Sequence, residues 1–147
     1  MEIKPVPNKG DFELRYPFLT RKATDHVGLS KETKGMTTST PVGRPLLHKD
    51  LKELPHKNDW NCRVAVGILG YLQGSTRPNI AMTVHQCACF SNDPMLLHEH
   101  AIKPIVQYLM ETAYLGIVYN PNAIKVIECF IDADFARGWN QIGSDNS

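Results

Sequence analysis

Between residues 59 and 115, apolar residues recur every three or four positions in three successive runs. This spacing gathers apolar side chains on one side of an α-helix, so each run predicts an amphipathic helix. The runs are separated by the turn-forming residues Gly74 and Ser75 and by the segment 91–94, and Gly116 follows the last run. Three amphipathic helices joined by such short links predict a small antiparallel three-helix bundle.

The ends of these helices can be predicted from residues that start or stop a helix. Asp59 is expected to cap the first helix, and Asp93 with Pro94 is expected to open the third. Pro104 lies inside the third helix, where it crowds the carbonyl of His100 at a cost of about 3 kcal/mol and predicts a kink. The side chains expected to face the bundle interior are Val64, Ile68, Tyr71, Leu72, Ile80, Val84, Ala88, Leu97, Ala101, Ile105, Tyr108 and Leu109.

The segments on either side of the bundle predict strands and a short helix. The first residues predict an N-terminal β-hairpin, with Ile3 before a turn at 7–10 and the alternating apolar residues Phe12 and Leu14 after it. Residues 17–29 predict one short helix that starts at Pro17 and ends at Gly28. After Gly116, residues 117–119, a turn at 120–122 and the β-branched run 124–131 predict a C-terminal hairpin.

The expected class is therefore α+β, with four segments along the chain. Residues 1–29 form the hairpin and short helix, and residues 30–58 are an extended linker rich in proline and polar residues. Residues 59–115 are the helical region. Residues 116–147 begin a further sheet and end in a polar tail.

Charge and cysteine content limit the possible functions. The net charge of +1 conceals an uneven distribution, because residues 1–58 carry 11 basic and 7 acidic side chains. Such a modest basic excess, spread along loops, favours ordinary surface over a dedicated polyanion site. Cys62, Cys87, Cys89 and Cys129 are interpreted as small core residues. We expect an intracellular protein, because the sequence shows neither a membrane span nor a signal peptide.

Particular residues, in a particular order, resemble the copia-type retrotransposon polyprotein. The most specific match is the run 76–80, Thr-Arg-Pro-Asn-Ile, at a helix start. The other matching residues are Arg63, Gly67, Tyr71, Leu72, Val84, Phe90, Pro94, His98, Ala101, Tyr108 and Leu109, then 116–119 and 132–136. Their order resembles the region that joins the reverse transcriptase to ribonuclease H in that family.

This resemblance implies that the chain is a polyprotein fragment consisting of thumb or connection helices followed by the first strands of a truncated ribonuclease H-like domain. Asp132 would then be the first carboxylate of the ribonuclease H site, which holds magnesium only in an intact domain. Arg63 and Arg77 would contact the RNA or DNA template-primer. One carboxylate cannot hold two magnesium ions, so we expect no cofactor and no catalysis in this chain alone.

Several residues depart from the family pattern. Asn79 stands where aspartate is usual, Cys89 and Gln107 stand where arginine is favoured, and Arg137 stands where glycine is expected. Fewer arginines leave fewer contacts to phosphates, so we expect template-primer binding to be weak or absent. Missing polyprotein segments are the expected partners, and no membrane partner is expected.

Other functions remain open. His85, Cys87 and Cys89, with His98 and His100 further along, raise the possibility of a metal site, but their spacing fits no established zinc pattern. The plainer interpretation is core cysteines and surface histidines. A cysteine nucleophile is disfavoured, because a thiol on an apolar helix face stays protonated. The main alternative is a free-standing helical interaction module without catalysis.

Overall fold

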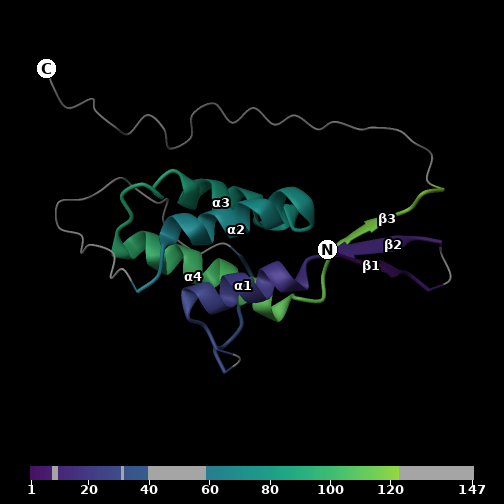
Figure 1. Ribbon diagram of the computed structural model, residues 1–147, viewed down its shortest axis with the longest axis horizontal. Coiled ribbons are helices and arrows are strands. Elements are labelled where there is room, and N and C mark those ends of the chain that lie inside the picture. The colour runs from purple at the N-terminus through teal and green to yellow at the C-terminus, as the bar shows by residue number, and fades with distance from the viewer. Residues whose placement is uncertain (8–9, 31, 40–58, 123–147) are drawn as a thin grey trace, which may run out of the picture.

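The computed structural model describes residues 1–7, 10–30, 32–39 and 59–122. In chain order its elements are β1 (Glu2–Pro5), β2 (Phe12–Arg15), α1 (Pro17–Val27), α2 (Cys62–Ser75), the 3-10 helix η1 (Pro78–Ile80), α3 (Ala81–Ala88), α4 (Leu96–Glu111) and β3 (Ile117–Tyr119). Figure 1 shows the α-helices gathered together and the strands projecting beyond one end of them. The predicted α+β class is confirmed.

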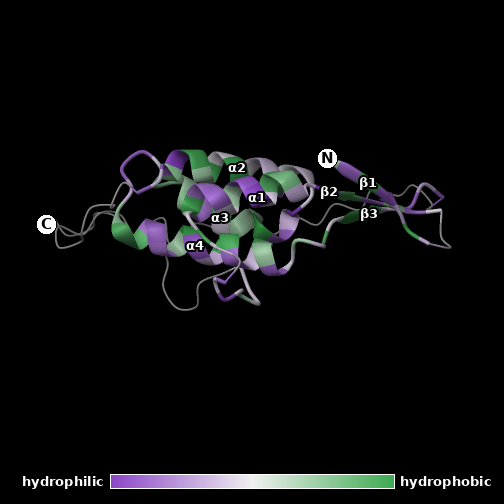
Figure 2. Cartoon of the chain, turned by 60° about the horizontal axis from the view of Figure 1, so that its bottom comes forward, coloured by the Kyte–Doolittle hydropathy of each residue, from purple (hydrophilic) through white to green (hydrophobic). Residues whose placement is uncertain are grey.

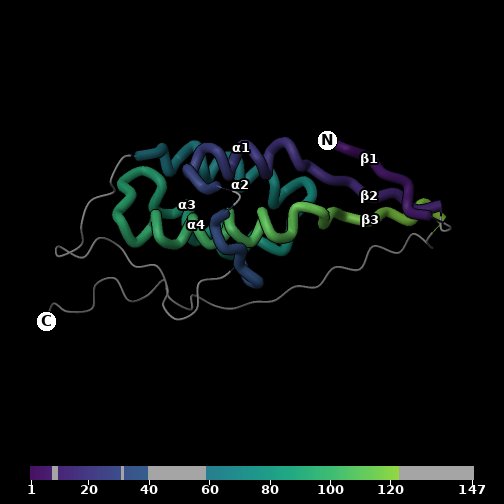
Figure 3. Tube along the Cα trace, turned by 90° about the horizontal axis from the view of Figure 1, so that it is seen from below, coloured from purple at the N-terminus to yellow at the C-terminus, as the bar shows by residue number. Residues whose placement is uncertain are grey.

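The α-helices pack side by side around one core. α1 packs against α2 and α4, and α3 also packs against α2 and α4. Figure 3 shows the same arrangement from below, with the sheet beyond the end of the bundle. Within the described residues the bundle thus has four helices where the sequence predicts three, because α1 joins the bundle and buries Ala23 and Val27 in it. The other buried core residues are Trp60, Cys62, Ala65, Val66, Leu69, Leu72, Ile80, Val84, Cys87, Ala101, Ile102, Ile105, Val106 and Leu109.

Helix α1 begins and ends where the sequence predicts. Pro17 occupies its first turn, where a missing backbone donor costs nothing. Gly28 adopts the left-handed conformation at φ 72°, which glycine reaches without a steric penalty. The N–H groups of Gly28 and Leu29 then bond back to the last turn of the helix and satisfy its carbonyls.

Helix α2 starts later than predicted. Its N-cap is Asn61 rather than Asp59, and the side chain of Asn61 accepts a hydrogen bond of 3.1 Å from the N–H of Val64. The predicted inward face is wrong for Val64 and Tyr71, which are exposed. Apolar residues occur on most sides of α2. Its contacts with three neighbouring helices, and not the periodicity of the sequence, therefore decide which of these apolar side chains are buried.

The starts of α3 and α4 also differ in detail from prediction. Pro78 opens the short η1, and α3 follows it directly. Met95, rather than Asp93 or Pro94, caps α4, and Leu97 is exposed instead of inward. Helix α4 continues through Pro104, and the kink expected there stays a prediction.

The three strands form one antiparallel sheet in the order β1-β2-β3. The predicted pairing of β1 with β2 places Ile3 opposite Leu14. β3 then pairs with the other edge of β2, where Ile117 lies opposite Leu14 and Tyr119 opposite Phe12. The start and end of the described chain therefore meet in one sheet.

Two predicted segments lie outside the described residues. They are the second strand of the C-terminal hairpin, at 124–131, and most of the linker, at 40–58. Asp132 is also outside them.

Figure 2 shows hydrophilic and hydrophobic stretches alternating around the helices, as amphipathic packing requires.

Candidate nucleic-acid interface

Arg77 lies in the link between α2 and η1, and its side chain is buried rather than exposed, with 4% of the residue accessible. Its Nη1 donates to the backbone carbonyl of Thr112 at 2.9 Å, and its Nη2 donates to the hydroxyl of Thr112 at 2.5 Å. The guanidinium also lies 5.4 Å from the ring centre of Tyr108. Arg77 therefore fastens the start of η1 to the end of α4.

The surroundings of Arg77 explain how its charge is tolerated. Burial lowers the pKa of its guanidinium, while the charge interaction and the hydrogen bond with Tyr108 act in the opposite direction. Thr112 is the C-cap of α4, and the carbonyls at the end of a helix carry partial negative charge that favours a cation. The resemblance assigns Arg77 a contact with the template-primer, and the sequence gave no sign of this structural role, because Thr112 lies 35 residues away.

Asn79 completes the contacts around Arg77. Its side-chain oxygen accepts from Arg77 Nε at 3.4 Å, and its Nδ2 donates to the hydroxyl of Tyr108 at 2.6 Å. The aspartate expected at this position would pair with the guanidinium as a charged partner. Among the described residues, no carboxylate forms an ion pair with Arg77.

Arg63 differs from Arg77 in being exposed, on the first turn of α2. α1 runs antiparallel to α2, because the two helices touch at both ends. The hydroxyls of Tyr16 and Tyr71 lie 3.1 Å apart at one end, and His26 Nε2 lies 2.9 Å from the carbonyl of Asn61 at the other. Arg63 therefore sits beside the C-terminal end of α1.

Arg21 and Lys22 are exposed on α1, which packs against the helix α2 that carries Arg63, and these three exposed cations of the helix pair are called the basic surface here. Asp25 is also exposed on α1 and offsets part of this charge. Three cations can contact phosphates, but they are few compared with the contacts of a dedicated nucleic-acid-binding domain.

The one carboxylate that the resemblance assigns to a catalytic site cannot be placed beside this surface. Asp132 lies outside the described residues, and within them no group of three or more His, Cys, Asp or Glu side chains could hold a metal ion. No helix of the described part is long and apolar enough to cross a membrane.

The cysteines divide into two environments. Burial raises the pKa of the Cys62 thiol to about 11 and that of the Cys87 thiol to about 12. Both side chains belong to the core, as predicted. Cys89 is exposed, so its assignment to the core is wrong. Cys129 lies outside the described residues.

His98 was expected at the surface, and this expectation is wrong, because only 2% of the residue is accessible. Its Nδ1 accepts a hydrogen bond of 2.9 Å from the N–H of Met95, and its ring stacks on Phe90 with centroids 4.4 Å apart. The imidazole thereby satisfies a backbone donor at the start of α4. Next to it, Glu99 is buried and pairs with Lys103 one turn further along the helix.

Curated proteins that are similar to the chain include two from Arabidopsis thaliana. A retrovirus-related Pol polyprotein from transposon RE2 is 30% identical over 118 residues, which are 76% of this chain and 8% of the polyprotein. An uncharacterized mitochondrial protein is 27% identical over 105 residues, which are 69% of this chain and 43% of that protein. These two similarities support a retrotransposon-related origin.

A secreted RxLR effector protein of Plasmopara viticola is 33% identical over 72 residues, which are 49% of this chain and 51% of the effector. The chain thus spans about half, or less, of the length of each of these relatives. No model of a known protein family matches the chain. No solved structure matches it either.

Proposed function

We propose that the chain is a fragment of a retrotransposon reverse transcriptase and ribonuclease H polyprotein, and that it comes from the region connecting the two enzymes. The observation that carries this proposal is the similarity of 76% of the chain to 8% of a transposon polyprotein. A stretch that matches only 8% of a polyprotein is one part of a larger protein. Its exposed surfaces are those that other parts of the polyprotein, or its nucleic acid, would contact.

In the intact polyprotein, the basic surface formed by Arg21, Lys22 and Arg63 contacts the sugar-phosphate backbone of the template-primer. Such contacts fix the position of the duplex and carry no sequence information. Arg77 takes no direct part, because its guanidinium is committed to Thr112. Its role is to hold the start of η1 and the end of α4 together.

The chain by itself is inactive as a polymerase and as a nuclease. Phosphoryl chemistry of this kind needs two metal ions held by several carboxylates, and Asp132 is the only residue matched to that set. Magnesium would bind only when the remaining carboxylates of an intact domain are supplied.

The binding test is fluorescence anisotropy with a labelled RNA–DNA hybrid duplex over a range of salt concentrations. Three phosphate contacts give a slope of log K against log salt of about −2.7, and Arg63→Gln should make it shallower by about 0.9. Arg77→Gln should leave the slope unchanged wherever the protein is still folded. Tight binding with a much steeper slope would contradict a fragment with so few phosphate contacts.

The catalytic test follows an RNA strand in the same duplex with magnesium present. No cleavage by the purified chain is the expected result. Cleavage that disappears in Asp132→Asn would show an active nuclease and overturn the proposal of inactivity.

The alternative function is a free-standing helical interaction module. The exposed Val64 and Tyr71 on α2 favour it, since both are large side chains on the outer side of the bundle. Salt-dependent binding to the duplex distinguishes the two functions. If the chain is an interaction module for protein partners, neither the unmodified chain nor Arg63→Gln should show this binding.

A further inference from the structure

Strand β1 has one edge that no other strand covers within the described residues, because it is the first strand in the order β1-β2-β3 and is exposed along its whole length. In an antiparallel strand the N–H and C=O of one residue point to the same side, and successive residues alternate. The Val6 N–H donates to the carbonyl of Asp11 at 2.8 Å, so Lys4 and Glu2 also direct their backbone groups toward β2. The N–H and C=O of Ile3 therefore point away from the sheet.

The side chain of Ile3 lies on the apolar face of this sheet. Ile3 lies opposite Leu14, and Leu14 lies opposite Ile117, so the three side chains form one row across the strands. Ile3 is nevertheless 62% accessible, because it ends the row. An exposed apolar side chain beside an outward-pointing backbone donor and acceptor is the feature by which sheet edges bind a further strand.

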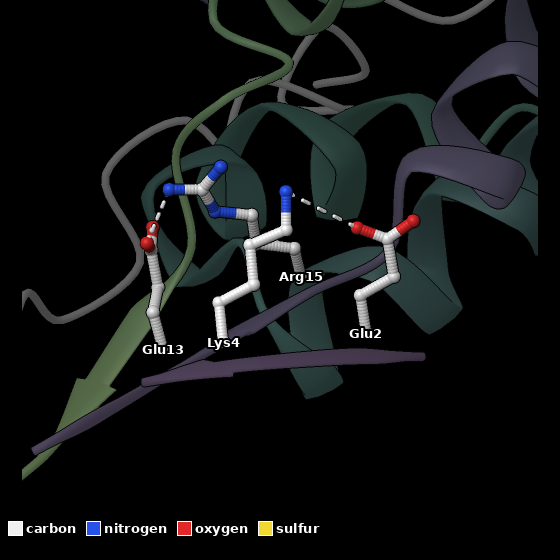
Figure 4. Close-up of polar contacts among 4 residues, drawn as sticks. All are labelled: Glu2, Lys4, Glu13 and Arg15. Carbon is white, nitrogen blue, oxygen red and sulfur yellow. Dashed lines mark hydrogen bonds and ion pairs between the residues drawn. The ribbon is translucent and has the colours of Figure 1, made fainter. Parts of the chain in front are cut away.

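The other face of the sheet is charged. Figure 4 shows Glu2, Lys4, Glu13 and Arg15 on the same side of the strands. Glu2 lies opposite Arg15, and Lys4 lies opposite Glu13. Within the strands, Lys4 Nζ lies 3.7 Å from a carboxylate oxygen of Glu2, and Arg15 pairs with Glu13. The charges on this face therefore alternate in sign both along the strands and across them.

We propose that β1 pairs antiparallel with β1 of a second copy of the chain, with Ile3 opposite Ile3, so that the sheets of the two copies become one. Each Ile3 donates its N–H to the carbonyl of the other, as a two-fold axis through this pair requires. Glu2 of each copy then lies opposite Lys4 of the other on the charged face. The alternation of sign continues across the joint, and the apolar row continues on the opposite face.

Charge selects both the register and the partner. Shifting the pairing by one step along the strand moves the two-fold axis to Glu2 or to Lys4, and each shift sets a charged residue against its own copy. The shift to Lys4 also places Pro5, which has no N–H, opposite Ile3. Only the register centred on Ile3 brings opposite charges together. The strand is therefore complementary to itself, which favours a second copy over an unrelated strand.

Pro5 limits the size of this contact. It is the next residue after Ile3 that faces outward, and its missing N–H ends the ladder there. So short a contact belongs to the weak class of interfaces, and it should weaken further as salt screens the charged pairs. The pairing occupies the same edge in both copies, so it gives a closed dimer. The inference does not depend on the retrotransposon function, because it rests on the sheet alone.

The experiment is sedimentation equilibrium of the full chain at low ionic strength, from micromolar to millimolar concentration. We expect a dimer that forms as the concentration rises. Glu2→Lys and Lys4→Glu each set like charges opposite one another, so each alone should raise the dissociation constant at least about tenfold. An equimolar mixture of these two variants restores opposite charges at both positions. It should therefore form a mixed dimer with a dissociation constant within about threefold of that of the unmodified chain.

Two further variants are controls. Asp25→Lys changes the net charge as Glu2→Lys does, but at the end of α1 that lies away from the sheet, and should leave the dissociation constant within about twofold. Ile3→Pro removes the outward N–H and keeps the bonds from β1 to β2, so it should abolish the dimer while the circular dichroism spectrum is retained.

Two results would overturn the proposal. A chain that stays monomeric up to millimolar concentration would show that the edge of β1 does not pair with itself. A dimer that Glu2→Lys and Lys4→Glu weaken no more than Asp25→Lys does would place the contact on another surface. The mixture of the two charge variants decides the matter even if Ile3→Pro folds poorly, because any repulsion that each variant introduces within its own sheet is the same in the monomer and in the dimer.

Discussion

Both terminal nitrogens of the Arg77 guanidinium donate to Thr112, which lies 35 residues further along the chain. This one side chain joins the link after α2 to the last turn of α4, and β3 begins five residues beyond Thr112. Arg77 therefore helps to set where the chain leaves the bundle for the sheet. Its contribution is to stability, whereas the exposed Arg63 can contribute to binding.

Replacing Arg77 by glutamine should lower the free energy of unfolding by about 2–3 kcal/mol. Hydrogen bonds from a charged donor are among the stronger ones, and their loss leaves the part-buried acceptors on Thr112 without this donor. Urea unfolding followed by circular dichroism measures the change. Arg63→Gln is the matched control and should shift stability by less than about 0.5 kcal/mol, since it removes an exposed side chain. Equal effects of the two changes would contradict the structural role of Arg77.

Replacing Asn79 by aspartate should stabilise the protein by about 1 kcal/mol at neutral pH, because the new carboxylate lies within reach of Arg77 Nε. The hydroxyl of Tyr108 can donate to this carboxylate in place of accepting from the amide. A nearby cation lowers the folded pKa of an aspartate, so the gain should be present above about pH 4 and lost as pH falls below it. Unfolding of both proteins at pH 7 and pH 3 tests this, and no gain at pH 7 would refute it.

The sequence predicts the helical elements best where local chemistry determines them. Pro17 and Gly28 bound α1 as expected, because a proline in the first turn and a left-handed glycine act within a few residues. The α+β class follows in the same way from the change of period after Gly116. The pairing of β1 with β2 could also be predicted, since the two strands are close in sequence.

The features that sequence could not predict depend on distant contacts. The exposure of Tyr71 reflects its position beside Tyr16, with ring centroids 5.5 Å apart, at the outer edge between two helices. The burial of Arg77 depends on where α4 ends. The pairing of β3 with β2 joins segments about 100 residues apart, and no local pattern specifies such a partner.

The ion pair between Glu13 and Arg15 predicts a dependence on pH at the sheet. The hydrogen bond from Arg15 lowers the pKa of the Glu13 carboxyl below its usual value. A lowered folded pKa means that the stabilisation is present above the unfolded value, about 4.3, and is lost as pH falls through the folded value. Glu13→Gln should remove this dependence at a cost of less than about 1 kcal/mol.

A carboxyl titration of Glu13 by nuclear magnetic resonance measures this pKa directly. Arg15→Gln is the matched variant, since it removes the partner of Glu13. An unshifted Glu13, or an unchanged midpoint in Arg15→Gln, would show that the pair does not form in solution.

The cysteines should differ sharply in their reaction with a thiol reagent. The thiolate is the reactive form, and burial raises the pKa of Cys62 to about 11 and of Cys87 to about 12. Cys89 is exposed. In a Cys129→Ser background at pH 8, iodoacetamide should therefore modify Cys89 alone in the folded protein and all three cysteines in urea. Mass spectrometry of the digested protein identifies each site, and modification of Cys87 as fast as that of Cys89 would show that the end of α3 does not stay packed in the core.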